Sequence, residues 1–212
     1  EVGGDYFGYF PAGPGRFAVV VGDATGHGVA AGLVVGMAKA VLSTLRLGAR
    51  TGGPAGWLSE LNGALKASVA QRGLGMCLGL AHVETETGGV RLGVAGVPHS
   101  FHWKAGRGAL VRLELSAPPL GYLSRVDPAT AELELEPGDR LVLFTDGLIE
   151  QRSGSGEMWD YDGIEEALAP LCAAGVPPLV TARALLDACA AFASGAPLDD
   201  DQTVVVLARS TG

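Results

Sequence analysis

The sequence predicts an α+β fold in which two mainly antiparallel sheets pack face to face, with helix pairs outside them. Three observations support this prediction. The expected order is strands, two helices, many strands, two helices and one strand, so helices and strands are segregated along the chain. Many expected strands are joined by short Gly-rich or Pro-rich turns, which are typical of hairpins. Two strands are apolar throughout, which predicts burial on both faces.

The N-terminal part predicts a β-hairpin and then a long helix. Strands over Tyr6–Phe10 and Arg16–Gly22 flank a Pro/Gly turn. The longest apolar stretch, Val29–Leu45, contains Lys39 near its middle and is shorter than a membrane span requires. We therefore expect a central buried helix over about Val29–Leu47.

A second helix follows the Gly52-Gly53-Pro54 run and carries an apolar residue at every fourth position, at Trp57, Leu61, Leu65 and Val69. Beyond it, Gly-rich turns divide the chain into short strands, one of which alternates with a period of two and should be half exposed. The expected strands are Met76–Glu84, Val90–Ala95, Ser100–Lys104, Ala109–Leu115, the alternating Ala131–Glu136, Arg140–Thr145 and Thr203–Ala208, and the expected helices are Gly163–Ala174 and Pro178–Ala193.

Composition limits the class of protein. The 212 residues suffice for one substantial domain, and 48% hydrophobic against 18% charged residues argues against disorder. A net charge of −8 makes nucleic acid or an anionic membrane an unfavourable partner. Three cysteines without CxxC spacing, Cys77, Cys172 and Cys189, predict free thiols in a reducing, cytoplasmic compartment.

The start of the chain indicates where the domain lies in its protein. It shows no signal peptide and opens directly on a motif, with no leading strand. We expect residues 1–212 to form a single catalytic domain, excised from a longer chain and lacking its first strand. The remainder of that chain could carry a sensor or a membrane anchor.

Four aspartates each stand where a strand should end in a tight turn: Asp5, Asp23, Asp146 and Asp200. Any one of them alone is better explained as a turn or helix-cap residue. Several converging carboxylates, however, repel one another unless a divalent cation neutralises them. Carboxylate oxygens suit Mg²⁺ or Mn²⁺, and such ions can activate water without a nucleophilic side chain. The pattern predicts a metal-dependent enzyme whose site is assembled from distant segments.

The strings around these aspartates resemble the ordered motifs of the PPM-type metal-dependent serine/threonine protein phosphatases, in their bacterial SpoIIE-like branch. The resemblance spans nearly the whole chain, and five strings in order are far more specific than any one. The strings are Val2-Gly3-Gly4-Asp5-Tyr6, Gly22-Asp23-Ala24-Thr25-Gly26-His27-Gly28, Leu135-Glu136-Pro137-Gly138-Asp139, Thr145-Asp146-Gly147-Leu148-Ile149-Glu150 and Asp200-Asp201-Gln202-Thr203.

The resemblance implies an αββα sandwich with two Mn²⁺ or Mg²⁺ ions and a metal-bound water as the nucleophile. It implies that Asp23 bridges both ions, and that Asp5 and the backbone carbonyl of Ala24 serve one of them. Asp146 and Asp200 would serve the other.

Neighbouring residues are expected to support these ligands. His27, Gly147 and Asp201 are candidates for such a supporting role. Adjacent residues entering a strand point to opposite sides, so only one of Asp200 and Asp201 can readily face the site, and the resemblance selects Asp200. The chain departs from the family pattern at Gly8, where a second aspartate is common.

The remaining histidines, His82, His99 and His102, fall in or beside strand segments, and we predict that they are not catalytic. A dehalogenase-type phosphotransferase is rejected, because its nucleophilic aspartate, two residues before the acid partner, would fall at Phe144.

The function implied by the resemblance is hydrolysis of phosphoserine or phosphothreonine on a regulatory protein, such as an anti-anti-sigma (STAS) domain in a partner-switching pathway. A homodimer is compatible with this reading, and no membrane contact by this domain is expected. The alternative is a catalytically silent pseudo-phosphatase that acts as a regulated binding module. Loss of a core aspartate would mark it, and the sequence retains all four.

Overall fold

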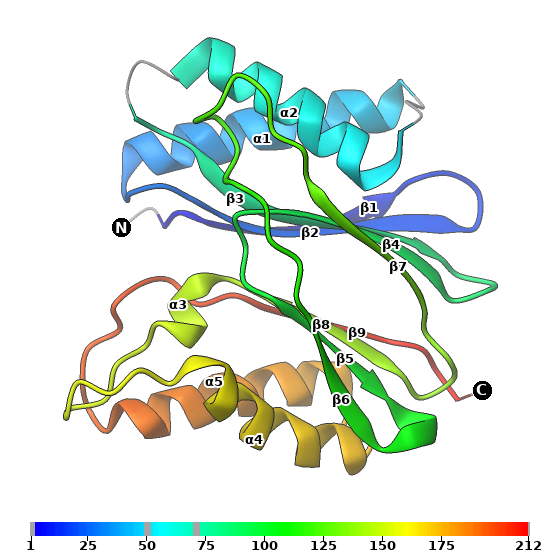
Figure 1. The fold of residues 1–212 in the computed structure, drawn as a ribbon, viewed down its shortest axis with the longest axis vertical. Coiled ribbons are helices and arrows are strands. Elements are labelled where there is room, and N and C mark those ends of the chain that lie inside the picture. Colours follow the sequence, from blue (N-terminus) through cyan, green and yellow to red (C-terminus); the bar gives the residue numbers. More distant parts are fainter. Residues whose placement is uncertain (1–2, 49–51, 70–72, 212) are drawn as a thin grey trace. The chain divides into compact units, whose positions relative to one another are not determined.

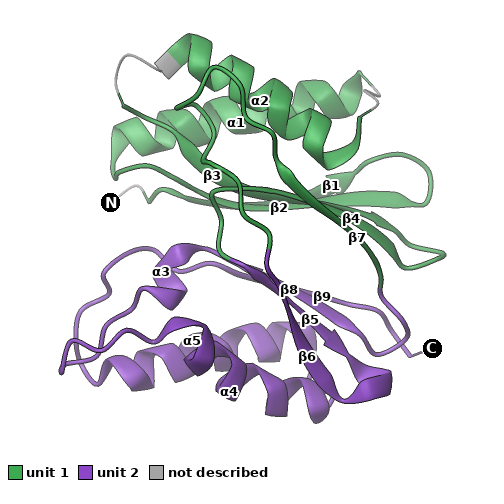
Figure 2. Ribbon diagram, viewed as in Figure 1, with its two compact units in different colours: residues 1–98, 115–134 green, residues 99–114, 135–212 purple. Residues whose placement is uncertain are grey.

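The structure is a computed structural model that describes residues 3–48, 52–69 and 73–211 (Figure 1). The chain divides into two compact units (Figure 2). Unit 1 comprises residues 1–98 and 115–134, and unit 2 comprises residues 99–114 and 135–212. Each unit contains one antiparallel sheet and a pair of long helices, which confirms the predicted α+β class.

The sheet of unit 1 has five strands in the order β1-β2-β3-β4-β7, and every neighbouring pair is antiparallel. The predicted N-terminal hairpin is confirmed, because β1 pairs with β2 along its whole length. In β2 the residues from Ala18 to Gly22 are all buried, as an apolar central strand requires. The strands are β1 (Asp5–Pro11), β2 (Arg16–Ala24), β3 (Met76–Glu84), β4 (Gly89–Ala95) and β7 (Ala129–Glu134).

Two helices, α1 (Val29–Leu47) and α2 (Gly53–Val69), lie side by side over one face of this sheet (Figure 1). The predicted apolar face of α2, with a residue at every fourth position, is confirmed, since Trp57, Leu61 and Leu65 are all buried in the core of the unit. The side chain of Val69 lies outside the described set.

The bounds of α1 agree with prediction, but the expectation of a central buried helix was wrong. One face of α1 is packed against the unit, through Ala31, Val34, Ala38, Leu42 and Leu45. The opposite face leaves large apolar side chains in solvent, with Leu33 60% and Leu47 78% exposed. Apolar composition alone does not specify how many faces of a helix find partners. Among described helices α1 alone is long and apolar enough to pass for a membrane span, which is weak evidence for one.

The sheet of unit 2 has four strands in the order β6-β5-β8-β9, again with antiparallel neighbours. All five residues of β8 are buried, as predicted for the second fully apolar strand. Helices α4 and α5 pack with the sheet around a core that includes Phe101, Phe144 and Leu185. The elements are β5 (Ser100–Lys104), β6 (Ala109–Leu113), β8 (Arg140–Phe144), α3 (Asp146–Ile149), α4 (Asp160–Ala173), α5 (Pro178–Ala193) and β9 (Val204–Ala208).

Several details differ from prediction. Strand β7 was expected over 131–136 but runs over 129–134, because its ladder ends where its partner β4 begins, at the pair Gly89 and Glu134. Helix α4 begins at Asp160, three residues before the predicted start at Gly163. The short helix α3 was not predicted, because four residues are too few to show a helical period.

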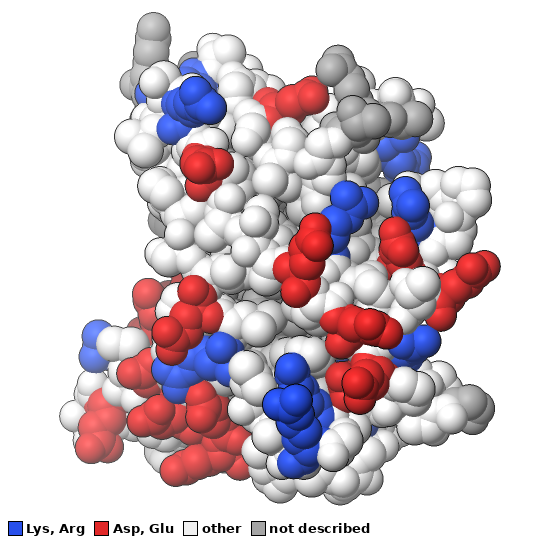
Figure 3. Space-filling model, turned by 45° about the vertical axis from the view of Figure 1, so that its right-hand side comes forward, with Lys and Arg blue, Asp and Glu red and all other residues white. Residues whose placement is uncertain are grey.

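Acidic residues are concentrated in unit 2. Its sequence contains 14 acidic and 7 basic residues, against 9 acidic and 8 basic in unit 1. In Figure 3 acidic side chains crowd the lower part of the view, where unit 2 lies. Unit 2 therefore carries nearly all of the net charge of −8.

Candidate metal centre

Unit 1 brings three of the predicted ligands together at one end of its hairpin. Asp5, the first residue of β1, is paired directly opposite Asp23 near the end of β2. Residues opposite each other in an antiparallel pair project on the same face of the sheet, so both carboxylates belong to one side. The next residue, Ala24, donates its backbone N–H to the carbonyl of Gly4 at 3.0 Å, which holds the end of β2 against the segment before β1.

The glycine before Asp5 is required by close approach. A Cβ atom on Gly4 would lie 2.4 Å from Oδ1 of Asp23 and 2.6 Å from the carbonyl oxygen of Ala24. Any side chain there would displace both oxygens. The same measurement shows that the Asp23 carboxylate and the Ala24 carbonyl share one small region, as two ligands of one ion must.

Unit 2 brings the other two predicted ligands together. Asp146 is the first residue of α3, directly after β8, and Asp200 lies in the loop before β9. Burial raises the pKa of the Asp146 carboxyl above its usual range, and the negative charge of Asp200 raises it further. The two carboxylates are thus near enough to repel each other, which is the condition that a divalent cation relieves.

The predicted supporting residues differ in their placement. Gly147 and Asp201 are in contact, since a Cβ on Gly147 would lie 2.1 Å from the carbonyl oxygen of Asp201. Asp201 also donates its N–H to Oδ1 of Asp200 at 2.8 Å. His27 lies in the exposed loop between β2 and α1.

Two residues near the unit 2 aspartates were not singled out from the sequence. The pKa of the exposed Glu150 is raised by partial burial and then by the charges of Asp146 and Asp200, so its carboxyl lies within range of both charges. The spacing of four residues from Asp146 at the start of a helix is a signal that could have identified it. Gln202 donates a hydrogen bond to the carbonyl of Gly147 at 3.0 Å, a contact that no local pattern reveals.

The three histidines predicted to be non-catalytic are engaged in packing and pairing. His82 meets the edge of Trp57, with ring centroids 4.8 Å apart. His99 stacks on Tyr161 at 5.3 Å. His102 pairs through Nε2 with the buried carboxylate of Asp139 at 3.1 Å. The same carboxylate accepts hydrogen bonds from the backbone N–H groups of Ala105 and Glu136.

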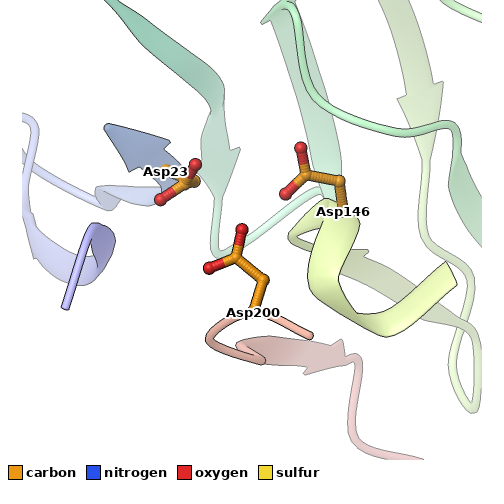
Figure 4. Close-up of side chains that lie close together, drawn as sticks. All are labelled: Asp23, Asp146 and Asp200. Carbon is orange, nitrogen blue, oxygen red and sulfur yellow. The ribbon is translucent and has the colours of Figure 1, made fainter. Parts of the chain in front are cut away.

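The donors present are suited to hard divalent cations. The predicted ligands are carboxylates and one backbone carbonyl, which are the oxygen donors that Mg²⁺ and Mn²⁺ prefer. Figure 4 shows three of them with the elements that carry them: Asp23 at the end of β2, Asp146 at the start of α3 and Asp200 in the loop before β9. The residues therefore fit the metal ions that the sequence predicts.

The SpoIIE family, described as stage II sporulation protein E, matches residues 13–210. The chain belongs to the SpoIIE family. This SpoIIE-family match covers both units and four of the five motif strings completely, and the family is one of PP2C-type (PPM) phosphatase domains. No curated protein matches the chain.

Several solved structures resemble this SpoIIE-family chain over nearly its whole length. The SiaA-PP2C domain of Pseudomonas aeruginosa has a TM-score of 0.84 at 23% identity, covering 98% of this chain and 81% of that one. The RsbU and RsbW domains of Rv1364c from Mycobacterium tuberculosis have a TM-score of 0.78 at 22% identity, and the match covers 99% of this chain. A third structure contains the PP2C phosphatase domain of Bacillus subtilis SpoIIE and a fragment of its regulatory domain. Its TM-score is 0.77 at 20% identity, and the match covers 97% of this chain. The chain spans 57% of each of the last two. At these identities the likeness shows the PP2C fold.

Proposed function

We propose that this domain is an active metal-dependent phosphatase that hydrolyses phosphoserine or phosphothreonine on a protein, with two Mn²⁺ or Mg²⁺ ions as cofactors. The observation that carries the proposal is the pairing of carboxylates within each unit. In unit 2 the charge of Asp200 raises the pKa of the partly buried Asp146, so these two carboxylates lie near each other. In unit 1 Asp5 stands directly opposite Asp23 in the hairpin.

The ligands would divide between the two ions according to the unit that carries them, apart from one shared residue. Asp5, Asp23 and the carbonyl of Ala24 would hold one ion, and Asp146 and Asp200 the other, with Asp23 shared. Bound divalent ions would lower the pKa of water and offset the charge of a phosphate group. The chain's own carboxylates would fix the positions of the ions, and Asp146, being partly buried, would do so in a region of reduced solvent.

The proposed substrate is a phosphorylated regulatory protein, such as a STAS domain. Similar structures include a chain that joins an RsbU domain to an RsbW domain and a SpoIIE chain with a regulatory fragment, so related phosphatase domains occur in regulatory proteins. We further propose that both units form a single catalytic domain, since the family match runs through both.

The test compares the wild-type chain with Asp23→Asn on a generic phosphate ester, with and without Mn²⁺. We expect the wild type to hydrolyse the ester in Mn²⁺ and to lose this activity in a chelator. Asp23→Asn should lower turnover by more than about a hundredfold, because losing a direct ligand should cost at least as much as the 10–100-fold of an outer-shell change. The far-UV circular dichroism spectrum should stay native.

A matched control is Asp127→Asn, which makes the same chemical change at an exposed position of unit 1 and should leave turnover unchanged. Near wild-type activity in Asp23→Asn at saturating Mn²⁺ would reject the ligand assignment. A wild-type chain that neither binds Mn²⁺ nor hydrolyses the ester would support the pseudo-phosphatase instead.

A further inference from the structure

A side-chain amide, that of Gln202, helps to link the loop that carries Asp200 to the turn that carries Asp146. Nε2 of Gln202 donates to the carbonyl oxygen of Gly147 at 3.0 Å and to Oε1 of Gln151 at 3.2 Å. The same nitrogen lies 3.5 Å from Sγ of Cys189 in α5. The two N–H groups of the amide are thus directed at two oxygen acceptors on the segment that follows Asp146.

The orientation of this amide is fixed by its neighbour. Gln151 is fully buried, and its own Nε2 donates to the carbonyls of Arg152 at 3.0 Å and Pro197 at 3.1 Å. Its nitrogen therefore faces two acceptors, which leaves Oε1 to accept from Gln202. Both amides have one arrangement that satisfies the network.

Direct backbone contact accompanies this link. The carbonyl of Asp201 lies against Gly147 so closely that a Cβ there would be 2.1 Å away. On the other side of Asp146, the N–H of Thr203 donates to Oγ1 of Thr145 at 3.0 Å, and the N–H of Thr145 donates to the carbonyl of Thr203 at 3.1 Å. The two segments are therefore joined on both sides of Asp146, through the three residues that follow Asp200.

Such a link opposes a specific force. Before a cation binds, the negative charges of Asp146 and Asp200 repel each other and favour separation of the loop from the turn. A side chain that resists this separation without adding negative charge must be neutral and must donate hydrogen bonds, and a glutamine amide meets both conditions.

We propose that Gln202 is a positioning residue that holds Asp146 and Asp200 at the spacing that a divalent cation requires before the cation arrives. This role rests on the proposed function, in which these two carboxylates are ligands of one ion. Gln202 acts through the Gly147 carbonyl and Gln151.

The experiment measures the Mn²⁺ dissociation constant by calorimetry in Gln202→Met, Gln202→Asn and the wild type. Methionine keeps the length of glutamine without its donors, and asparagine keeps the amide one methylene short of Gly147. We expect the dissociation constant to rise by about tenfold or more in Gln202→Met, and by less in Gln202→Asn. Turnover at saturating Mn²⁺ should recover to within about threefold of wild type, because the ligands themselves are intact.

A second readout requires neither metal nor activity. In the metal-free protein, hydrogen exchange of the segment 199–203 should be faster in Gln202→Met than in wild type, because the loop has lost its link to Gly147. The control is Leu198→Ala, which removes a side chain that is 63% exposed from the same loop. It should change neither the dissociation constant nor the exchange rate. If Gln202→Met does not fold, Gln202→Asn decides the question.

Mn²⁺ binding within twofold of wild type in a folded Gln202 variant would overturn the positioning role and leave the proposed function standing. Reduced thermal stability with unchanged Mn²⁺ affinity would have the same meaning, since it would describe a structural residue alone. A wild-type chain that binds no Mn²⁺ would overturn the proposed function and, with it, the role of Gln202.

Discussion

Asp200 and Asp201 are chemically identical neighbours in very different surroundings. The charge of Asp200 acts on both Asp146 and Glu150, whose pKa values it raises. Asp201 contributes backbone atoms to the same region, with its N–H bonded to Asp200 and its carbonyl packed against Gly147. The choice of Asp200 as the ligand stays a prediction, and the two residues can be separated by experiment.

Separate substitutions should distinguish the two. Asp200→Asn removes a charge that faces Asp146, and we expect Mn²⁺-dependent hydrolysis to fall by more than about a hundredfold. Asp201→Asn keeps the backbone contacts, and the loss should be about tenfold or less. Turnover at several Mn²⁺ concentrations provides the measurement. A larger loss at Asp201 than at Asp200 would mean that the predicted register is shifted by one residue.

At the scale of a single element, β3 carries a buried histidine whose protonation opposes folding. His82 is 9% exposed, and its Nε2 atom is buried without a hydrogen-bond partner among the described residues. Burial, and then the positive charges of Arg91 and Arg16, lower the pKa of His82 to about 4 from its ordinary value of 6.5. The folded chain therefore binds this proton less readily than the unfolded chain does.

This difference predicts a loss of stability in acid. Because the folded pKa lies below the unfolded one, the contribution of neutral His82 is complete above pH 6.5 and declines as pH falls toward 4. The loss should reach about 3 kcal/mol at most. Urea unfolding of metal-free protein across this range should show a flatter pH dependence in His82→Phe than in wild type. Leu198→Ala, which removes no titratable group, should retain the wild-type slope. An identical slope in His82→Phe would contradict this account.

The elements show what local sequence can and cannot predict. The bounds of α1 and α5 follow from apolar spacing between Gly and Pro residues, so a local pattern was sufficient. The limits of β7 depend on where β4 begins, and the exposed face of α1 depends on which partners the fold supplies. Those outcomes are set by tertiary contacts that no window of residues contains.

The same distinction applies to the candidate site. The expectation that all four aspartates stand where strands end was wrong for two of them, because Asp5 opens β1 and Asp200 lies in the loop before β9. Asp23 lies near the end of β2, and Asp146 follows β8 closely.

The need for Gly4 and Gly147 to lack a side chain arises from oxygens of residues distant in sequence, at Asp23 and Asp201. The link from Gln202 to Gly147 likewise joins positions 55 residues apart.

At the scale of the whole molecule, metal binding should be linked to folding. The proposed ligands come from the beginning, middle and end of the chain, so a site that uses all of them can exist only in the folded chain. A cation that binds the folded chain alone stabilises it by mass action. It would also offset part of the acidity of unit 2, where 14 acidic residues accompany 7 basic ones.

The melting temperature should therefore rise with Mn²⁺ or Mg²⁺. At about a hundredfold excess over the dissociation constant, each site adds roughly 2.7 kcal/mol. For a chain of this size that corresponds to about 5–10 °C, since 1 kcal/mol shifts such a domain by about 2–4 °C. A chelator should reverse the gain, and ester hydrolysis should appear over the same range of metal concentration.

Asp146→Asn provides the matched variant, because its two effects have opposite signs. Burial and Asp200 raise the pKa of Asp146, so the ionised carboxyl disfavours the folded state at neutral pH. Asparagine removes that charge and should raise the melting temperature of the metal-free protein, while the gain produced by Mn²⁺ becomes smaller. A melting temperature that stays constant up to millimolar Mn²⁺, in a wild-type chain that hydrolyses no ester, would contradict the metal centre. Stabilisation by Mn²⁺ without hydrolysis would keep the metal centre and favour a domain whose turnover depends on another part of its protein.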